Sequence, residues 1–122
     1  MTDKEMAIDF LTLVTSNNVR DAFKKYVDKN FIHHNPFFRG DSESLLSAME
    51  EDAAKNPNKL FEIRHAVHEG DTVTIHSHIR MIQGDSGFAA AHIFRFKDDF
   101  IVELWDIVQR VPENYPNENG MF

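Results

Sequence analysis

A chain of 122 residues has a length typical of one domain with one core, and its net charge of −7 disfavours a nucleic-acid partner. The sequence contains no cysteine, which excludes disulfides, thiolate metal sites and a cysteine nucleophile. No apolar run approaches the roughly 20 residues of a membrane span, and Met1 to Glu5 lack the pattern of a secretory signal. We therefore expect a single cytoplasmic domain over residues 1–122, with no membrane partner.

The first half of the chain is predicted to be helical. Thr2 and Glu5 form a capping-box pattern, and apolar residues follow at helical spacing. The expected helices run from Thr2 to the break at Asn17-Asn18, from Val19 to Val27, and from Asp41 or Ser42 to Asn56-Pro57. Between the second and third, Phe31 to Phe38 is predicted to be irregular.

The second half changes to the alternating pattern of β-strands. The expected strands are Phe61 to His68, Thr72 to Gln83, Phe88 to Lys97, and Phe100 to Val111. Asp98-Asp99 is predicted to form a tight turn, and residues 112–122 an extended tail. This order indicates an α+β fold: a curved antiparallel sheet of about four strands, plus one possible short strand, capped by three N-terminal helices. Eleven phenylalanines favour an apolar internal pocket in this cone.

Seven histidines provide most of the candidate chemistry. His34 and Asn35 follow the second predicted helix, His76 and His78 share one face of a strand, and His92 lies on the next strand. Asp106 lies in an otherwise apolar stretch of the last strand, on the face opposite Glu103 and Gln109. Imidazoles and a carboxylate inside apolar walls are typical of sites that transfer protons near neutral pH.

Each candidate also has a purely structural interpretation. Asn35 with Pro36 suits a turn, and the pair His76 and His78 suits the polar face of a half-exposed strand. His92 fits a core histidine with its hydrogen bonds satisfied, and Asp106 an ion pair. These alternatives remain open from the sequence.

Taken in order, several short motifs make the sequence recognisable. They are His34-Asn35-Pro36, His76-Ser77, Ile93-Phe94-Arg95, Ile101-Val102-Glu103, Trp105-Asp106, Gln109 and Gly120-Met121-Phe122. The sequence resembles the SnoaL-like polyketide cyclases, a branch of the nuclear-transport-factor-two-like superfamily. The resemblance implies a cystatin-like cone, a homodimer formed through the sheet, and in some members aldol ring closure without metal or organic cofactor.

The resemblance also implies a set of site residues. Those that match the branch's pattern are His34, Asn35, His76, Trp105, Asp106 and Gln109. Two positions depart from it: relatives often have an acid where this chain has His92, and a histidine where it has Leu104. His92 is therefore a candidate to replace the missing acid as the base.

Our preferred hypothesis is a cofactor-independent cyclase or isomerase that binds a small hydrophobic carbonyl compound and removes a proton next to its carbonyl group. Asp106 or His92 is the expected base and the other assists it, while His34 and Asn35 stabilise the enolate oxygen. The expected substrate-binding residues are Asn35, His76, His78, Trp105, Gln109, Phe37 and Phe38.

Two other hypotheses come from different classes. One is a non-catalytic module that binds a small molecule or dimerises. The other is a metalloprotein, because His76, His78 and His92 are similar to the His-x-His ligand set of cupins. No glutamate follows the pair at the position that cupins use, and three helices do not suit that all-β fold, so we expect no metal.

Overall fold

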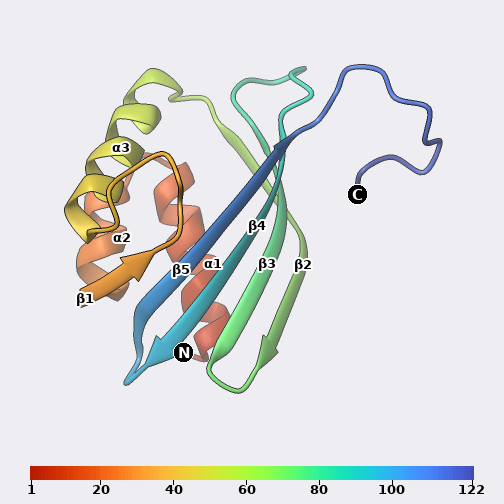
Figure 1. The fold of residues 1–122 in the computed structure, drawn as a ribbon. Coiled ribbons are helices and arrows are strands. Elements are labelled where there is room, and N and C mark those ends of the chain that lie inside the picture. The colour runs from red at the N-terminus through yellow and green to blue at the C-terminus, as the bar shows by residue number, and fades with distance from the viewer.

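Three helices cover one face of a five-stranded sheet in the computed structural model, which describes residues 1–122 (Figure 1). The helices are α1 (Asp3–Thr15), α2 (Val19–Tyr26) and α3 (Ser42–Lys55). The strands are β1 (Val27–His33), β2 (Leu60–Glu69), β3 (Thr72–Arg80), β4 (Phe88–Lys97) and β5 (Phe100–Arg110). This arrangement confirms the predicted α+β class with a curved sheet under helices.

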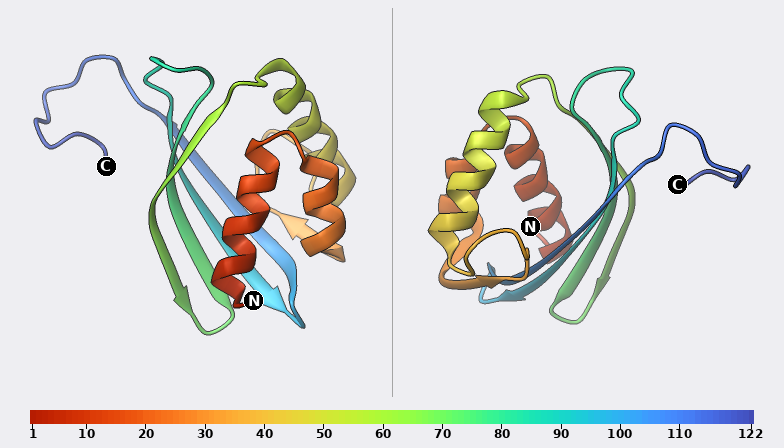
Figure 2. Two further views of the ribbon diagram at one scale, coloured as in Figure 1. Left: turned by 180° about the vertical axis from the view of Figure 1, so that it is seen from behind. Right: turned by 45° about the horizontal axis from the view of Figure 1, so that its top comes forward.

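The sheet has the order β1-β5-β4-β3-β2. Strands β2 to β5 form an antiparallel meander, and β1 joins the edge of the sheet by pairing parallel to β5. The sheet curves around the helices, and the C-terminal tail leaves β5 and extends on the side away from them (Figure 2). The sheet therefore has an inner face toward the helices and an outer face that they do not cover. No helix is both long enough and apolar enough to span a membrane.

Strand β1 differs from the sequence-based expectation of an irregular segment. Phe31 and His33 are buried and Ile32 between them is 47% exposed, which is strand alternation over only three residues. The pairing register with β5 also shifts between Val27 and Ile32. A run this short carries little signal, and its partner strand lies about seventy residues further along the chain. Only tertiary pairing makes it a strand.

Helix α1 begins where the sequence predicts. The Glu5 backbone N–H donates to Thr2 Oγ1 at 3.1 Å, and the Thr2 N–H donates to Glu5 Oε1 at 3.0 Å, which completes the capping box. On the inner side, the ring of Phe10 lies 5.5 Å from that of Phe23 and 5.8 Å from that of Phe94. Phe10 and Phe94 are fully buried, so this contact fixes α1 on β4.

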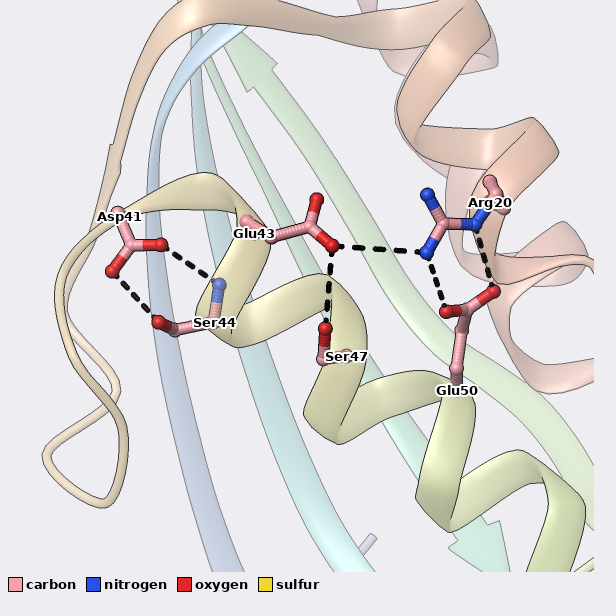
Figure 3. Close-up of polar contacts among 6 residues, drawn as sticks. All are labelled: Arg20, Asp41, Glu43, Ser44, Ser47 and Glu50. Atoms are coloured by element: carbon pink, nitrogen blue, oxygen red, sulfur yellow. Dashed lines mark hydrogen bonds and ion pairs between the residues drawn. The ribbon is translucent and has the colours of Figure 1, made fainter.

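Helix α3 is held over the sheet by both polar and apolar contacts. The Asp41 side chain accepts a hydrogen bond from the Ser44 N–H at 2.9 Å and caps the helix. Arg20 of α2 donates two hydrogen bonds to Glu50 of α3, at 2.8 and 3.1 Å (Figure 3). An exposed ion pair of this kind contributes about 0–1 kcal/mol, so burial of Leu45 and Leu46 does most to hold α3.

The loop between β3 and β4 contains a position that only glycine can occupy. Gly87 has φ +75°, and a Cβ there would lie 2.2 Å from the carbonyl oxygen of Ile79. Gly84 in the same loop has φ +90° but no atom within 4 Å of such a Cβ. Both glycines need the left-handed conformation, and only Gly87 also needs the space.

We expect Gly87→Ala to lower the free energy of unfolding by about 2 kcal/mol more than Gly84→Ala. The shared conformational cost cancels in this comparison, which leaves the clash with the backbone of β3. Urea denaturation of the two variants measures the difference. Equal destabilisation would contradict the close approach of the loop to β3.

Candidate functional site

A cavity of about 310 Å³ lies between the helices and the inner face of the sheet. Ten of its sixteen lining residues are hydrophobic, so its interior is mainly apolar. Its apolar walls include Leu11 and Val14 of α1, Leu45 and Met49 of α3, Ile79 of β3 and Phe88 of β4. A largely apolar cavity with a few converging polar groups is typical of a small-molecule site.

His92 and Asp106 are the titratable pair of the inner sheet face that lines this cavity. They stand directly opposite each other on β4 and β5, so their side chains share one face. His92 Nε2 lies 3.3 Å from Asp106 Oδ1, and the two side chains are only 7% and 10% exposed. The distance is that of an ion pair, but Oδ1 forms no aligned hydrogen bond. The pair is therefore enclosed and only partly satisfied.

Asn35 fixes the other oxygen of the carboxylate. Its Nδ2 donates to Asp106 Oδ2 at 2.9 Å, while its Oδ1 accepts from the Phe37 backbone N–H at 3.0 Å. Asn35 therefore orients the carboxylate through one of its two Nδ2 hydrogens. The second Nδ2 hydrogen has no partner, and Asn35 lines the cavity, so this donor remains available to a substrate oxygen.

His33 holds the backbone of Asn35 in place. Its Nδ1 accepts the Asn35 backbone N–H at 3.1 Å, and its Nε2 lies 2.6 Å from the carbonyl oxygen of Arg39. Because Nδ1 is an acceptor, the ring proton belongs on Nε2, where it is donated to Arg39. This buried, neutral histidine ties the end of β1 to the loop that follows it.

The pKa of Asp106 lies below the ordinary value of 3.8. Burial raises this pKa, but the neighbouring His92 imidazole and the hydrogen bond from Asn35 lower it by more. Asp106 is therefore ionised at neutral pH although it lies in an apolar cavity. A buried carboxylate with one oxygen free of hydrogen bonds is typical of a group retained for chemistry rather than for stability.

Several predicted site residues lie on the outer face instead. Trp105 and Gln109 of β5 lie one and three residues from Asp106, so strand alternation directs them to the opposite face, away from the cavity. Gln109 pairs with Ala89 of β4, which in turn pairs with His78 of β3. His76 and His78 are therefore also on the outer face, opposite His92.

His34 also lies outside the cavity. Its Nε2 contacts Glu103 Oε2 at 2.7 Å, and its ring stacks on Trp105 at 4.9 Å. Glu103 also accepts a hydrogen bond from Arg95 at 2.9 Å, and these two partners lower its pKa, the His34 hydrogen bond most. The structure therefore places His34 in a polar network on the outer face, where it cannot reach an enolate oxygen in the cavity.

The outer-face histidines contact the end of the chain. His65 Nδ1 lies 2.9 Å from His76 Nδ1, and Phe122 stacks on His78 at 4.4 Å and on His76 at 5.6 Å. Burial, followed by the neighbouring His65 and Arg64, lowers the pKa of His76. His76, His78 and His92 thus lie on two faces and cannot converge on one metal ion. Nowhere does the chain gather three or more side chains suited to a metal.

The two phenylalanines of the predicted wall separate as well. Phe38 lines the cavity, whereas Phe37 is 84% exposed and lines no part of it. Of the ten predicted site residues, the structure brings Asn35, Phe38, His92 and Asp106 together at the cavity.

The sequence analysis missed three polar residues of this region. His33 is not a residue of the family motif, which begins at His34. Strand alternation at the end of β1 is the only signal in the sequence that directs its side chain inward. Asp52, in the last turn of α3, and Lys59, which directly precedes β2, also line the cavity. They read as ordinary surface residues, and no sequence pattern predicts that the Lys59 side chain is only 8% exposed.

Comparison with solved structures places this arrangement in a known fold. A protein of unknown function from Cytophaga hutchinsonii, described as NTF2-like, has 21% sequence identity and a TM-score of 0.70, with 89% of this chain and 91% of that chain covered. A provisionally named polyketide cyclase from Acidithiobacillus ferrooxidans has 20% identity and a TM-score of 0.72, with 89% of each chain covered. A cystatin-fold protein from Novosphingobium aromaticivorans has 20% identity and a TM-score of 0.73, with 88% and 98% covered.

These likenesses, at low sequence identity, establish the fold alone. No curated protein matches the sequence. The family model described as SnoaL-like polyketide cyclase matches residues 5–113, which include all five strands and all but the first two residues of α1. The chain therefore belongs to the SnoaL-like polyketide cyclase family.

Proposed function

We propose that this protein is a cofactor-independent cyclase or isomerase that acts on a small carbonyl compound bound in the inner cavity. The observation that carries the proposal is the contact of His92 with Asp106, 3.3 Å apart and buried beside a mainly apolar cavity of about 310 Å³. The family and its provisionally named cyclase relative support the same class of chemistry.

Asp106 is the base in this proposal. Its lowered pKa keeps it ionised, and Asn35 holds one carboxylate oxygen in place. When an apolar substrate fills the cavity and excludes water, the carboxylate loses solvation and becomes a stronger base. It removes a proton from the carbon next to the carbonyl group, and the electron pair of that C–H bond forms an enolate.

His92 completes the reaction. In a cyclisation, the enolate carbon attacks a second carbonyl of the same molecule, which forms a carbon–carbon bond and leaves an alkoxide. His92 donates its Nε2 proton to this alkoxide, and the proton taken by Asp106 passes to the same nitrogen across the 3.3 Å contact, which restores both groups. In an isomerisation, the proton returns to another carbon. Neither route changes the oxidation state of the substrate.

The outer face of the sheet is the proposed interface with a second copy of the chain. Ile107 and Val67 are 57% and 60% exposed there, although they lie in strands. A sheet face of this kind is covered most simply by the same face of another copy, as in an isologous dimer.

Exchange of α-protons of a ketone tests whether Asp106 is the base. We expect the wild-type protein to accelerate exchange of the α-protons of 1-tetralone for deuterium, and Asp106→Asn to reduce that acceleration by about 10²–10⁴-fold. Proton NMR in D₂O measures the rate. Glu103→Gln is the matched control, because it removes a carboxylate from the same strand but from the outer face.

Exchange by Asp106→Asn at the wild-type rate would refute the assignment of the base. Binding of ketones without any accelerated exchange would instead assign the cavity to a ligand-binding module.

The lowered pKa of Asp106 makes the stability of the fold depend on pH. The folded-state pKa of Asp106 lies below its unfolded value, so its ionised form stabilises the fold above pH 3.8 and this contribution is lost as the pH falls through the lower pKa. We expect wild-type stability to fall more steeply than that of Asp106→Asn as the pH falls from the ordinary value of 3.8 toward the lower folded-state pKa. Denaturation in urea at a series of pH values tests this. Parallel curves would show that the pKa of Asp106 is not lowered.

A charge on the outer face tests the proposed association of two copies of the chain. Ile107→Glu places a charge on the exposed outer face and should convert a dimer to a monomer without loss of helix or strand content. Light scattering after size exclusion measures the mass. An unchanged mass for Ile107→Glu, or a monomeric wild type, would reject this interface.

A further inference from the structure

Lys59 is the one lysine of the chain that lines the inner cavity. It precedes β2 and follows the turn after α3, where a lysine is ordinarily exposed. Its side chain is nevertheless only 8% exposed. With Thr15 it also borders a second, more open groove of about 520 Å³, on the helix side of the sheet, along the end of α1 and the start of β2. The ammonium group therefore lies at the boundary between the apolar interior and this groove.

The ammonium is incompletely paired. Its one hydrogen-bonded partner is the carboxylate of Asp52, and a lysine ammonium has three donors. The remaining two N–H groups have no acceptor, although a buried donor without a partner is costly. Asp52 itself is 47% exposed, so its carboxylate can turn to water, whereas Lys59 remains buried. Two donors of a buried ammonium beside the cavity are therefore unused.

We propose that Lys59 binds a carboxylate group of the substrate, and that Asp52 occupies this position in the free protein. The substrate class is then an apolar carbonyl compound that carries a carboxylate. Its apolar body fills the cavity toward His92 and Asp106, and its carboxylate meets the ammonium at the mouth. The carbonyl half of this statement rests on the proposed function, whereas the carboxylate half rests on Lys59 alone.

Charge gives this contact its specificity. The chain has a net charge of −7, so it repels anions at long range, and only a local cation in a poorly hydrated position can select one. Hydrogen bonds to a charged group are among the stronger ones in proteins. Lys59 is thus a specificity-determining residue and takes no part in the proton transfers.

Binding of two matched probes tests the proposal. Naphthalene-2-carboxylate and naphthalene-2-carboxamide have the same apolar body and differ in charge. By titration calorimetry, we expect the wild type to bind the carboxylate about tenfold more tightly than the amide. Lys59→Met should remove this preference, because it weakens binding of the carboxylate far more than binding of the amide. Retained binding of the amide also shows that the cavity is intact. Lys55→Met, an exposed lysine paired with Glu51 at the end of α3, should keep the preference.

A second variant acts in the opposite direction. Asp52→Asn removes the competing carboxylate and should increase the preference for the carboxylate probe several-fold. It decides the matter if Lys59→Met fails to fold. The proposal is overturned if the wild type shows no preference or binds neither probe, if Lys59→Met retains the preference, or if Asp52→Asn leaves it unchanged.

The outcome is separable from that of the proposed function. A carboxylate preference in a protein that does not accelerate exchange of 1-tetralone would support the anion site and reject the acid–base chemistry. Exchange that depends on Asp106 but comes with no carboxylate preference would do the reverse.

Discussion

The placement of His92 directly opposite Asp106 is the constraint on which the rest of the site depends. The two residues face the helices from neighbouring strands, at a point where α1 and α3 leave a cavity instead of a packed core. The buried Asp106 carboxylate needs a hydrogen-bond donor, and Asn35 provides one. Asn35 is in turn held by the hydrogen bond of its backbone N–H to His33. The edge strand β1 therefore does more than extend the sheet. It delivers the amide that orients the carboxylate.

The two faces of the sheet have different tasks because of this arrangement. The inner face carries apolar residues with one pair of an imidazole and a carboxylate, His92 and Asp106, and there low hydration strengthens electrostatic effects. The outer face carries the His34–Glu103–Arg95 network and the His65–His76 contact, where the groups neutralise or stack on one another. Polar residues of the family pattern thus divide between the inner face, at the cavity, and the outer face of the sheet. Lys59 adds a third element, a cation at the cavity mouth that the family pattern does not mark.

Much of the fold was predictable from local signals. The capping box at Thr2, the cap at Asp41 and the turn at Asp98-Asp99, where both residues have positive φ, lie where the sequence pattern places them. Strand β4 has its predicted bounds, because alternation over ten residues is a strong signal. The predicted fold class allows for one further short strand, but its place at β1 was not predicted, since its three alternating residues depend on a distant partner. Within β5, alternation correctly separates Asp106 from Glu103 and Gln109, because a period of two needs no tertiary information.

By itself, the sequence determined the elements, the α+β class and which residues of each strand share a face. Only the tertiary structure decided which face of one strand continues which face of the next. The pairing of Ile75 with His92 places His92 on the inner side, while His76, one residue away, turns outward. A one-residue difference in register would exchange these roles, so no inspection of single strands could assign them. Burial of Lys59 was decided in the same way, by the packing of α1, α3 and β2 around a side chain that directly follows a surface turn.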